Sequence, residues 1–279
     1  MQEGQPSRTA ERVAVERAAH QLLDSPLVLE DPLAIRVIAP ENRRELEKDP
    51  ARHDRSPISK PTRAIVVVRT RIAEDTLAAS GATQYVLLGA GLDTFAYRNP
   101  FPNVRVFEVD HPSTQALKRE RLATAGIQLP TSLSYAPCDF SRERLAMVLD
   151  SAGFDPSRPS VFAWLGVVMY LGRANVDDTL RYIATMPSGS AVIFDYAQPP
   201  EVFPWLQRMF YRKTLDRLAE MGEPWISFMQ PEPLRRDLIS FGFSSIDDLG
   251  GEELNSKYLS NRTDGLKARS IGRVVVARV

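Results

Sequence analysis

The chain has 279 residues, of which 43% are hydrophobic and 25% are charged, as in an ordinary globular protein. Its 35 basic and 35 acidic residues balance, which argues against a nucleic-acid-binding protein, because that affinity depends on excess positive charge. Cys138 is the only cysteine, so an internal disulfide is excluded and neither a zinc site nor any other metal site is expected.

The N-terminus is charged throughout and lacks the apolar segment of a signal peptide. The longest apolar run, over 161–172, is too short to span a bilayer. We therefore expect a cytoplasmic protein that has neither a membrane nor a nucleic acid as its partner.

The first 80 residues read as helical, and we expect them to form a cover that belongs to the same domain as the rest. Thr9 can cap a helix that ends near residue 23. The pair Asp31-Pro32 is typical of a second helix start, with an N-cap followed by proline at the first helical position. A third helix is predicted over 62–79, stopped by Gly81.

From residue 84 onward, short apolar runs alternate with amphipathic stretches. Continuous apolar strands separated by helices predict a parallel sheet covered on both faces, in a doubly wound, Rossmann-like α/β domain over 81–279. In such folds ligands bind beyond the carboxyl ends of the strands, so functional residues are expected just after positions 88, 109, 136, 165 and 196. The runs are QYVLL, VRVFEV, SLSYA, SVFAWL and SAVIFDY, with helices near 112–125, 141–152 and 173–186.

Residues 200–235 interrupt this alternation. They contain six aromatic residues, which predict either a lid over the ligand site or a helical cap with an ordinary core. Beyond them we expect a helix over 233–241, a short strand over 245–247 and a terminal strand over 271–279. The aromatic residues are Phe203, Trp205, Phe210, Tyr211, Trp225 and Phe228.

The first strand ends in a turn that contains Gly89, Ala90, Gly91 and Asp93. Two glycines in a strand-to-helix turn let the backbone approach a ligand closely. Thr94 stands where the dinucleotide fingerprint has its third glycine, and the charge of Asp93 would repel a pyrophosphate but not the ammonium and sulfonium of S-adenosylmethionine. The loop therefore favours S-adenosylmethionine over NAD, although Asp93 could instead cap the following helix.

Acidic residues also follow the second and third strands. Asp110 ends the second strand, where an acid can accept hydrogen bonds from ribose hydroxyls. Asp139 and Phe140 follow the third strand and suit an adenine, with the acid accepting from the amine and the ring packing on the base. The alternative for Asp139 is a cap of a helix that begins at Ser141. His111, beside Asp110, is expected to be a cofactor-side or structural residue.

Four segments occur in the order typical of the leucine carboxyl methyltransferase-like family, and the chain resembles that family from about residue 10 to about residue 260. The segments are YVLLGAGLDTFAYR, FEVDHPSTQALKRERL, FAWLGVVMYL and GEPWISF. The family is a class I S-adenosylmethionine-dependent methyltransferase group. Its members methylate a protein C-terminal carboxylate or, in many bacterial relatives, small metabolites.

The resemblance implies roles for the matching residues. Arg69 resembles the arginine that pairs with the methionine carboxylate, a task that suits a forked guanidinium, and Arg63 and Arg71 are alternatives. Asp110 resembles the ribose acid, and Glu108 is the less favoured candidate. The remaining matches are Gly89, Ala90, Gly91 and Asp93 on the methionine side and Asp139 and Phe140 at the adenine.

One position departs from part of the family. Leu165, expected at the cofactor site, stands where the protein-methylating branch carries an acid. This difference argues against an acidic role there and against a protein C-terminus as the methyl acceptor. The segment WLGV resembles the bacterial small-molecule branch.

No catalytic base can be assigned. Tyr170 and Tyr196 follow the fourth and fifth strands and could orient an acceptor oxygen, although packing explains both equally well. His20, His53 and His111 are each interpreted as structural or surface residues. This scarcity of bases favours an acceptor that is already an anion, such as a carboxylate or an acidic phenol or enol.

Together these features predict an S-adenosylmethionine-dependent O-methyltransferase that acts on a carboxyl or hydroxyl group of a small molecule. Two alternatives remain open at this point. The first is a non-catalytic S-adenosylmethionine-binding protein that regulates a partner, because the loop is intact while no base is assigned. The second is a nicotinamide-dependent oxidoreductase, which Asp93 and Thr94 disfavour.

Overall fold

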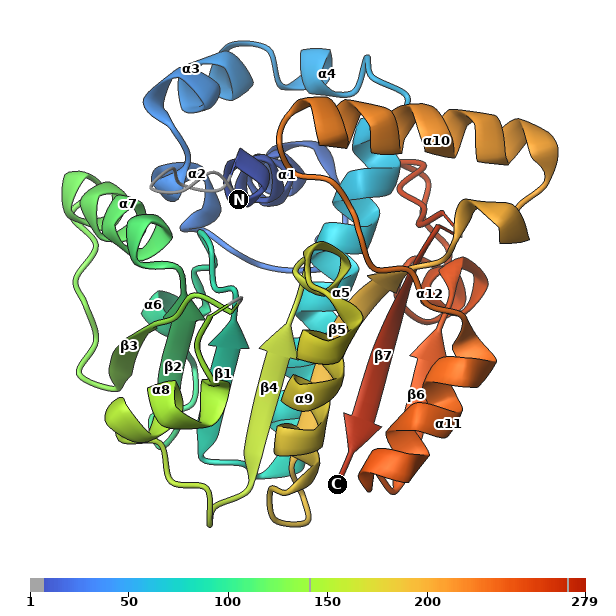
Figure 1. The fold of residues 1–279 in the computed structure, drawn as a ribbon. Helices are drawn as coiled ribbons and strands as arrows, with labels where there is room; N and C mark the ends of the chain where they lie inside the picture. The colour runs from blue at the N-terminus through green and yellow to red at the C-terminus, as the bar shows by residue number, and fades with distance from the viewer. Residues whose placement is uncertain (1–7, 141, 270) are drawn as a thin grey trace.

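The computed structural model describes residues 8–140, 142–269 and 271–279, and its centre is a seven-stranded sheet (Figure 1). The strand order is β3-β2-β1-β4-β5-β7-β6. Strands β1 to β5 run parallel to one another, whereas β7 is antiparallel to both β5 and β6. The strands are β1 (Gln84–Leu88), β2 (Arg105–Asp110), β3 (Leu133–Pro137), β4 (Ser160–Trp164), β5 (Ala191–Ala197), β6 (Ser245–Leu249) and β7 (Gly272–Arg278).

This arrangement confirms the predicted Rossmann-like, mostly parallel sheet. All five predicted parallel strands are present. Strands β1, β2, β4 and β5 are largely buried on both faces, as continuous apolar runs predict, whereas β3 at the edge of the sheet is only partly buried. The antiparallel β7 fills the place between β5 and β6 and gives the sheet its only reversed strand among the described residues.

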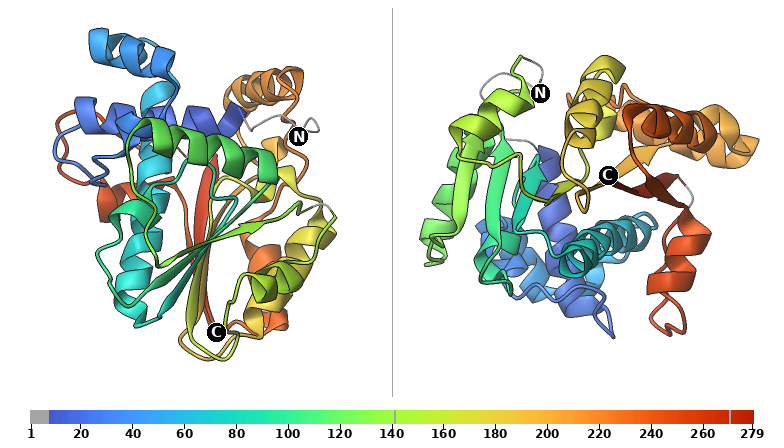
Figure 2. Two further views of the ribbon diagram at one scale, coloured as in Figure 1. Left: turned by 90° about the vertical axis from the view of Figure 1, so that its left-hand side faces the viewer. Right: turned by 90° about the horizontal axis from the view of Figure 1, so that it is seen from below.

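Helices cover both faces of the sheet (Figure 2). Helices α5 (Ser59–Ser80) and α12 (Gly251–Tyr258) lie on one face, and α8 (Leu145–Ser151), α9 (Arg173–Ala184) and α11 (Pro231–Phe241) lie on the other. The alternation of side chains along the strands explains the two cores: Leu87 packs with the first group and Leu88 with the second. Two more helices connect the first three strands. Helix α6 (Phe95–Arg98) lies between β1 and β2, and α7 (Pro112–Thr124) lies between β2 and β3.

The N-terminal segment forms α1 (Arg8–Leu23), α2 (Ala34–Val37), α3 (Pro40–Lys48) and α4 (Pro50–His53). Helix α1 lies above the carboxyl ends of the strands (Figures 1 and 2). The predicted first and third helices are present, and the third ends at Gly81 with φ +68°. The predicted N-cap Asp31 is wrong, because its carboxylate accepts a hydrogen bond from Thr94 and α2 begins three residues later.

The stretch after β5 contains a short 3₁₀ turn η2 (Pro200–Val202) and helix α10 (Trp205–Glu220). Tyr211 is buried against Phe203 in an edge-to-face contact, whereas Trp205 and Phe210 are 71% and 59% exposed. The aromatic residues therefore do not form one cluster. None of the described helices is long and apolar enough to cross a membrane.

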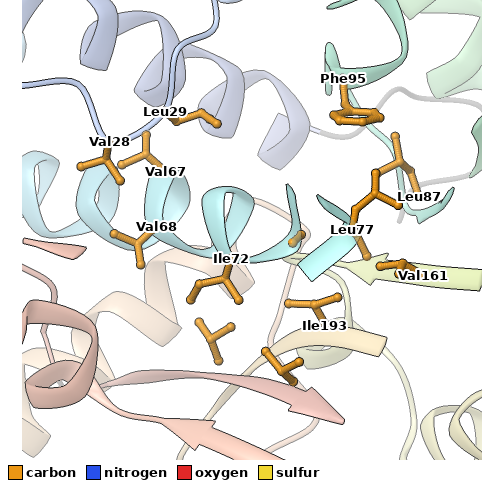
Figure 3. Packing of buried hydrophobic residues seen from close by; sticks show 14 of the residues in the cluster. Val28, Leu29, Val67, Val68, Ile72, Leu77, Leu87, Phe95, Val161 and Ile193 are labelled. Carbon is orange, nitrogen blue, oxygen red and sulfur yellow. The ribbon is translucent and has the colours of Figure 1, made fainter. Parts of the chain in front are cut away.

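Helix α5 lies in one of the two hydrophobic cores that flank the sheet (Figure 3). Val67, Val68 and Ile72 of this helix lie between the N-terminal segment on one side and the sheet on the other. Helix α5 thus joins the N-terminal helices to the sheet, and its packing fixes the position of every side chain it presents at the carboxyl ends of the strands.

Replacement of one residue of this helix should show how much the fold depends on it. Ile72 is 3% exposed, so Ile72→Ala should lower the free energy of unfolding by about 2–5 kcal/mol, the range for large-to-small core substitutions. The matched control Ile239→Ala removes the same atoms from an α11 position that is 56% exposed and should change stability by less than about 0.5 kcal/mol. Denaturant titration measures both values, and equal losses would contradict this role of α5.

Candidate active site

A cavity of about 450 Å³ lies at the carboxyl ends of the parallel strands. Its walls come from α1 and α5, from the ends of β1, β2, β3 and β4 and the residues that follow them, and from the loop after α10. Four of the five positions at which ligand contacts were predicted therefore border one space. The fifth, after residue 196, contributes no lining residue among the described ones.

The glycine loop brings the backbone close to two other segments. Gly89 has φ +70°, and a β-carbon there would lie 2.3 Å from Cγ2 of Val167. Gly91 has φ +48°, and a β-carbon there would lie 3.2 Å from Cβ of Ala10 in α1. Both the left-handed conformation and the close approach require glycine. Ala90 and both glycines line the cavity as predicted.

Asp110 lines the cavity and is bonded to the same loop. One carboxylate oxygen accepts from the Gly91 amide at 2.5 Å, and the other accepts from the His111 amide at 2.6 Å. Burial raises the pKa of Asp110, and these two hydrogen bonds only partly offset the effect. Asp110 therefore connects the end of β2 to the glycine loop of β1.

Glu108, the less favoured ribose candidate, does not line the cavity. It is fully buried, and its carboxylate lies 2.7 Å from Nζ of Lys118. Burial raises the pKa of Glu108 to about 7 although the neighbouring ammonium opposes this. Of the two acids on β2, only Asp110 reaches the cavity.

The residues expected at an adenine also border the cavity. Asp139 and Phe140 both line it, and the Asp139 carboxylate lies 3.7 Å from Nε of Arg142. The alternative cap at Ser141 concerns a residue outside the described part of the chain, and α8 begins only at Leu145. His111 lines the cavity too, and its side chain accepts from the Ser113 amide at the start of α7.

Arg69 reaches the cavity from α5. Its Nη1 donates to Asp195 at 2.6 Å, and the other carboxylate oxygen of Asp195 accepts from the Gly166 amide at 2.6 Å. Gly166 has φ +75°, and a β-carbon there would lie 2.9 Å from Nη2 of Arg69. The guanidinium is thus held flat against the backbone after β4, while its buried Nε has no hydrogen-bond partner among the described residues.

The two alternatives to Arg69 lie elsewhere. Arg63 is buried and donates to Asp24 and Asp54, and Arg71 is half exposed and pairs with Asp75. Neither lines the cavity.

Asp93 lines the cavity but is engaged by the protein itself. One carboxylate oxygen lies 2.6 Å from Nη1 of Arg17, and the other accepts from the Phe95 amide at 2.7 Å. Burial would raise the pKa of Asp93, but the guanidiniums of Arg17 and Arg98 outweigh it and the pKa is lowered. Asp93 is therefore ionised and paired. The alternative that Asp93 is the N-cap of the following helix is not met, because the N-cap of α6 is Thr94, although the second oxygen of Asp93 accepts from the first amide of that helix.

This pairing changes the argument against a dinucleotide. The charge of Asp93 is balanced by Arg17, so it would not by itself repel a pyrophosphate. The stronger argument is the length of α6, which has only four residues and so offers little of the helix dipole that holds a pyrophosphate.

The tyrosines proposed to orient an acceptor are separated by the fold. Tyr170 lines the cavity, whereas Tyr196 is 1% exposed and donates to Asp248 at 2.7 Å, away from it. Leu165 lines the cavity. His20 contacts Asp24 and His53 contacts Glu16, and both histidines lie outside the lining.

Sequence reasoning missed four residues that shape this cavity: Thr9, Arg17, Asp195 and Glu223. For Asp195 a signal existed, since an acid inside a fully buried strand demands a partner. For Thr9 and Glu223 no local signal existed, because they are 214 residues apart, and the contact of Arg17 with Leu92 spans 75 residues. None of the six aromatic residues of the 200–235 stretch lines the cavity, which the loop residues Gly222, Glu223, Pro224 and Ile226 border instead.

Comparison with known proteins shows which family the chain resembles. The model of the leucine carboxyl methyltransferase family matches residues 10–184. A Bacillus subtilis protein, YktD, whose name provisionally describes an S-adenosyl-L-methionine-dependent methyltransferase, is 35% identical over 199 residues. That match covers 67% of this chain and 62% of YktD. A Mycobacterium protein with the same provisional description is 37% identical over 142 residues, or 48% of this chain and 47% of its own length.

Solved structures share the fold along nearly the whole chain. One from Thermobifida fusca, provisionally named a methyltransferase, has a TM-score of 0.59 at 19% identity and covers 99% of this chain and 96% of its own. One from Streptomyces avermitilis, described as a DUF574 family protein, has a TM-score of 0.58 at 16% identity and covers 96% of both chains. The family match spans more than half of the sequence and includes every strand from β1 to β4. The chain therefore belongs to the leucine carboxyl methyltransferase family.

Proposed function

We propose that the protein is an S-adenosylmethionine-dependent O-methyltransferase whose acceptor is a carboxyl or hydroxyl group of a small molecule. The observation that carries the proposal is the gathering of Arg69, the glycine loop, Asp110 and Asp139-Phe140 around one cavity at the carboxyl ends of β1 to β4. The provisional names of the Bacillus and Mycobacterium relatives support the same cofactor and methyl transfer.

The residues present fit the three parts of S-adenosylmethionine. The unpartnered Nε of Arg69, beside a guanidinium already oriented by Asp195, suits the methionine carboxylate. Asp110 has its carboxylate anchored and buried at the end of β2, where it can accept from ribose hydroxyls. Asp139 and Phe140 offer an acceptor and a ring for the adenine.

When bound, S-adenosylmethionine supplies a methyl group already activated on a sulfonium. The chain's own contribution is then to hold the acceptor oxygen in line and to exclude water, which can account for most of the rate. Leu165, Val167 and Tyr170 wall the cavity after β4 with largely apolar surface, as water exclusion requires. The expectation that the acceptor is a small molecule rests on Leu165, which stands where an acid marks the protein-methylating branch.

The first test concerns the cofactor. Calorimetry should show binding of S-adenosylmethionine and S-adenosylhomocysteine and no binding of NAD, since the four-residue α6 offers a pyrophosphate little helix dipole. A metabolite extract supplied with methyl-labelled cofactor should then yield a labelled compound. Tight NAD binding would falsify the assignment, and cofactor binding without any labelled product would favour a regulatory protein that does not catalyse transfer.

The second test concerns Arg69. Arg69→Ala should weaken S-adenosylhomocysteine binding by about 1.5–3 kcal/mol, the range for a hydrogen bond to a charged group. The matched control Arg71→Ala, two residues along the same helix and outside the cavity, should leave the dissociation constant unchanged. Thermal melts verify that both variants are folded. If the two variants bind equally well, another group holds the methionine carboxylate.

The third test separates two roles of Asp110, which could contact ribose or merely support the glycine loop. If it contacts ribose, Asp110→Ala should reduce affinity for S-adenosylhomocysteine but hardly alter affinity for its 2′,3′-dideoxy analogue, because the lost bonds are to those hydroxyls. Calorimetry of the wild-type protein and of Asp110→Ala with both ligands gives the four affinities that this comparison needs. Equal losses would mean that Asp110 acts only by holding the loop.

A further inference from the structure

Helix α10 lies at the periphery of the molecule (Figures 1 and 2) and begins with a group of exposed apolar side chains. Five of the twelve large apolar side chains that are exposed among the described residues lie within the nine positions 202–210. Exposed apolar side chains that gather in one place mark an interaction site. We call these five residues the α10 patch: Val202, Trp205, Leu206, Met209 and Phe210.

The α10 patch faces solvent because the opposite side of the helix is held by the protein. Tyr211 and Leu218 are 1% and 6% exposed and form this inner side. The four patch residues that belong to α10 occupy positions i, i+1, i+4 and i+5, which lie next to one another on a helix surface. The patch is therefore one continuous surface with a fixed direction.

The α10 patch is hollow on one side and raised on the other. A hollow of about 380 Å³ opens along the helix, and Leu206 and Phe210 lie outside its lining. In an isologous contact across a two-fold axis, the hollow of each copy can receive the raised side chains of the other. The hollow is lined by Trp205, Arg208, Met209, Arg212, Lys213 and Asp216.

The charges at the two ends of the α10 patch complement each other. Lys213 and Arg217 follow the patch by about one and two helical turns on the same side of the helix. Glu201 precedes the patch and stays 61% exposed although it accepts from Arg212. If two α10 helices pack antiparallel about the centre of the patch, the basic end of each copy faces Glu201 and the Trp205 ring of the other. An ion pair and a cation–π contact then form at both ends.

A membrane surface fits the α10 patch less well. A helix that binds anionic lipids carries an excess of Lys and Arg on its polar side. In α10, Asp216 and Glu220 lie among the basic residues on the same side, and the whole chain has a net charge of zero. The mixed charges favour a surface that also carries both signs, as a second copy does.

We propose that the α10 patch is the interface of a homodimer in which two α10 helices pack antiparallel across a two-fold axis. This proposal goes beyond the proposed function and does not depend on it. Helix α10 leads into the loop that borders the cavity, and the Glu223 amide of that loop donates to the Leu218 carbonyl of the helix. The interface and the cavity are thus joined by one short segment of chain.

The first test measures the mass of the full chain in solution. Sedimentation velocity should show a species of twice the 31.2 kDa mass of one chain, with a dissociation constant of about 10 μM or tighter. Phe210→Glu places like charges at the centre of the interface and should weaken association by about thirtyfold or more, as for a central interface residue. The matched control Ile239→Glu in α11 should leave the dimer intact, because its position is 56% exposed against 59% for Phe210. Thermal melts verify that both variants are folded.

Cysteine cross-linking tests the antiparallel arrangement. The only cysteine of the chain, Cys138, is buried and does not interfere. A residue at a two-fold axis meets its own counterpart, so Met209→Cys should form a disulfide-linked dimer on mild oxidation. Arg217→Cys, on the same side but two turns further along, should stay unlinked, whereas helices packed in parallel would link at both positions.

The proposal is overturned by a dissociation constant weaker than about 10 μM, by unchanged association of Phe210→Glu, or by cross-linking of Arg217→Cys. A chain that remains monomeric, floats with phosphatidylglycerol vesicles and loses this binding in Phe210→Glu would assign the α10 patch to a membrane surface instead.

Discussion

The geometry of the cavity depends on two hydrogen bonds of the Asp195 carboxylate. This carboxylate is buried in β5 and joins the Arg69 guanidinium of α5 to the amide of Gly166 after β4. A buried charge is tolerated only where it is paired and hydrogen-bonded. Arg69, Asp195 and the Gly166 amide can therefore adopt few other arrangements. The pair fixes a positive group at the carboxyl edge of the sheet before any ligand arrives. Catalysis by positioning requires such preorganised groups.

A second buried network places the N-terminal helices in the site. Arg17 of α1 contacts the carboxylates of Asp31 and Asp93 and the carbonyl of Leu92, so the helix and the glycine loop hold each other. Removal of one member would leave a buried charge without compensation, which commonly costs about 3–5 kcal/mol. Helix α1 of the N-terminal segment therefore forms part of the cavity wall.

The features that could be predicted from the sequence are those that a short stretch of the chain determines by itself. Continuous apolar runs identified β1 to β5, and the residues after four of them proved to border one cavity. Short polar helices such as α3 and α12 were missed because they have few apolar residues: α3 buries only Leu46, and α12 only Gly251 and Leu254. Contacts between distant segments leave no local trace either, which is why Asp31 was mistaken for a helix cap and Glu223 received no role.

The residues that line the cavity lie far apart in the sequence, and this separation affects how the cavity forms during folding. Thr9 and Glu223 touch across 214 residues, and the chain between them supplies the rest of the lining except Pro224 and Ile226. Contacts of such separation carry the largest loop-closure entropy and form late in folding. During synthesis Thr9 must therefore wait for Glu223 until most of the sheet has emerged, although α1 can already pack against α2 and α5. A molecule that binds the finished cavity acts on the completed fold alone, and its presence shifts the folding equilibrium toward that state by mass action.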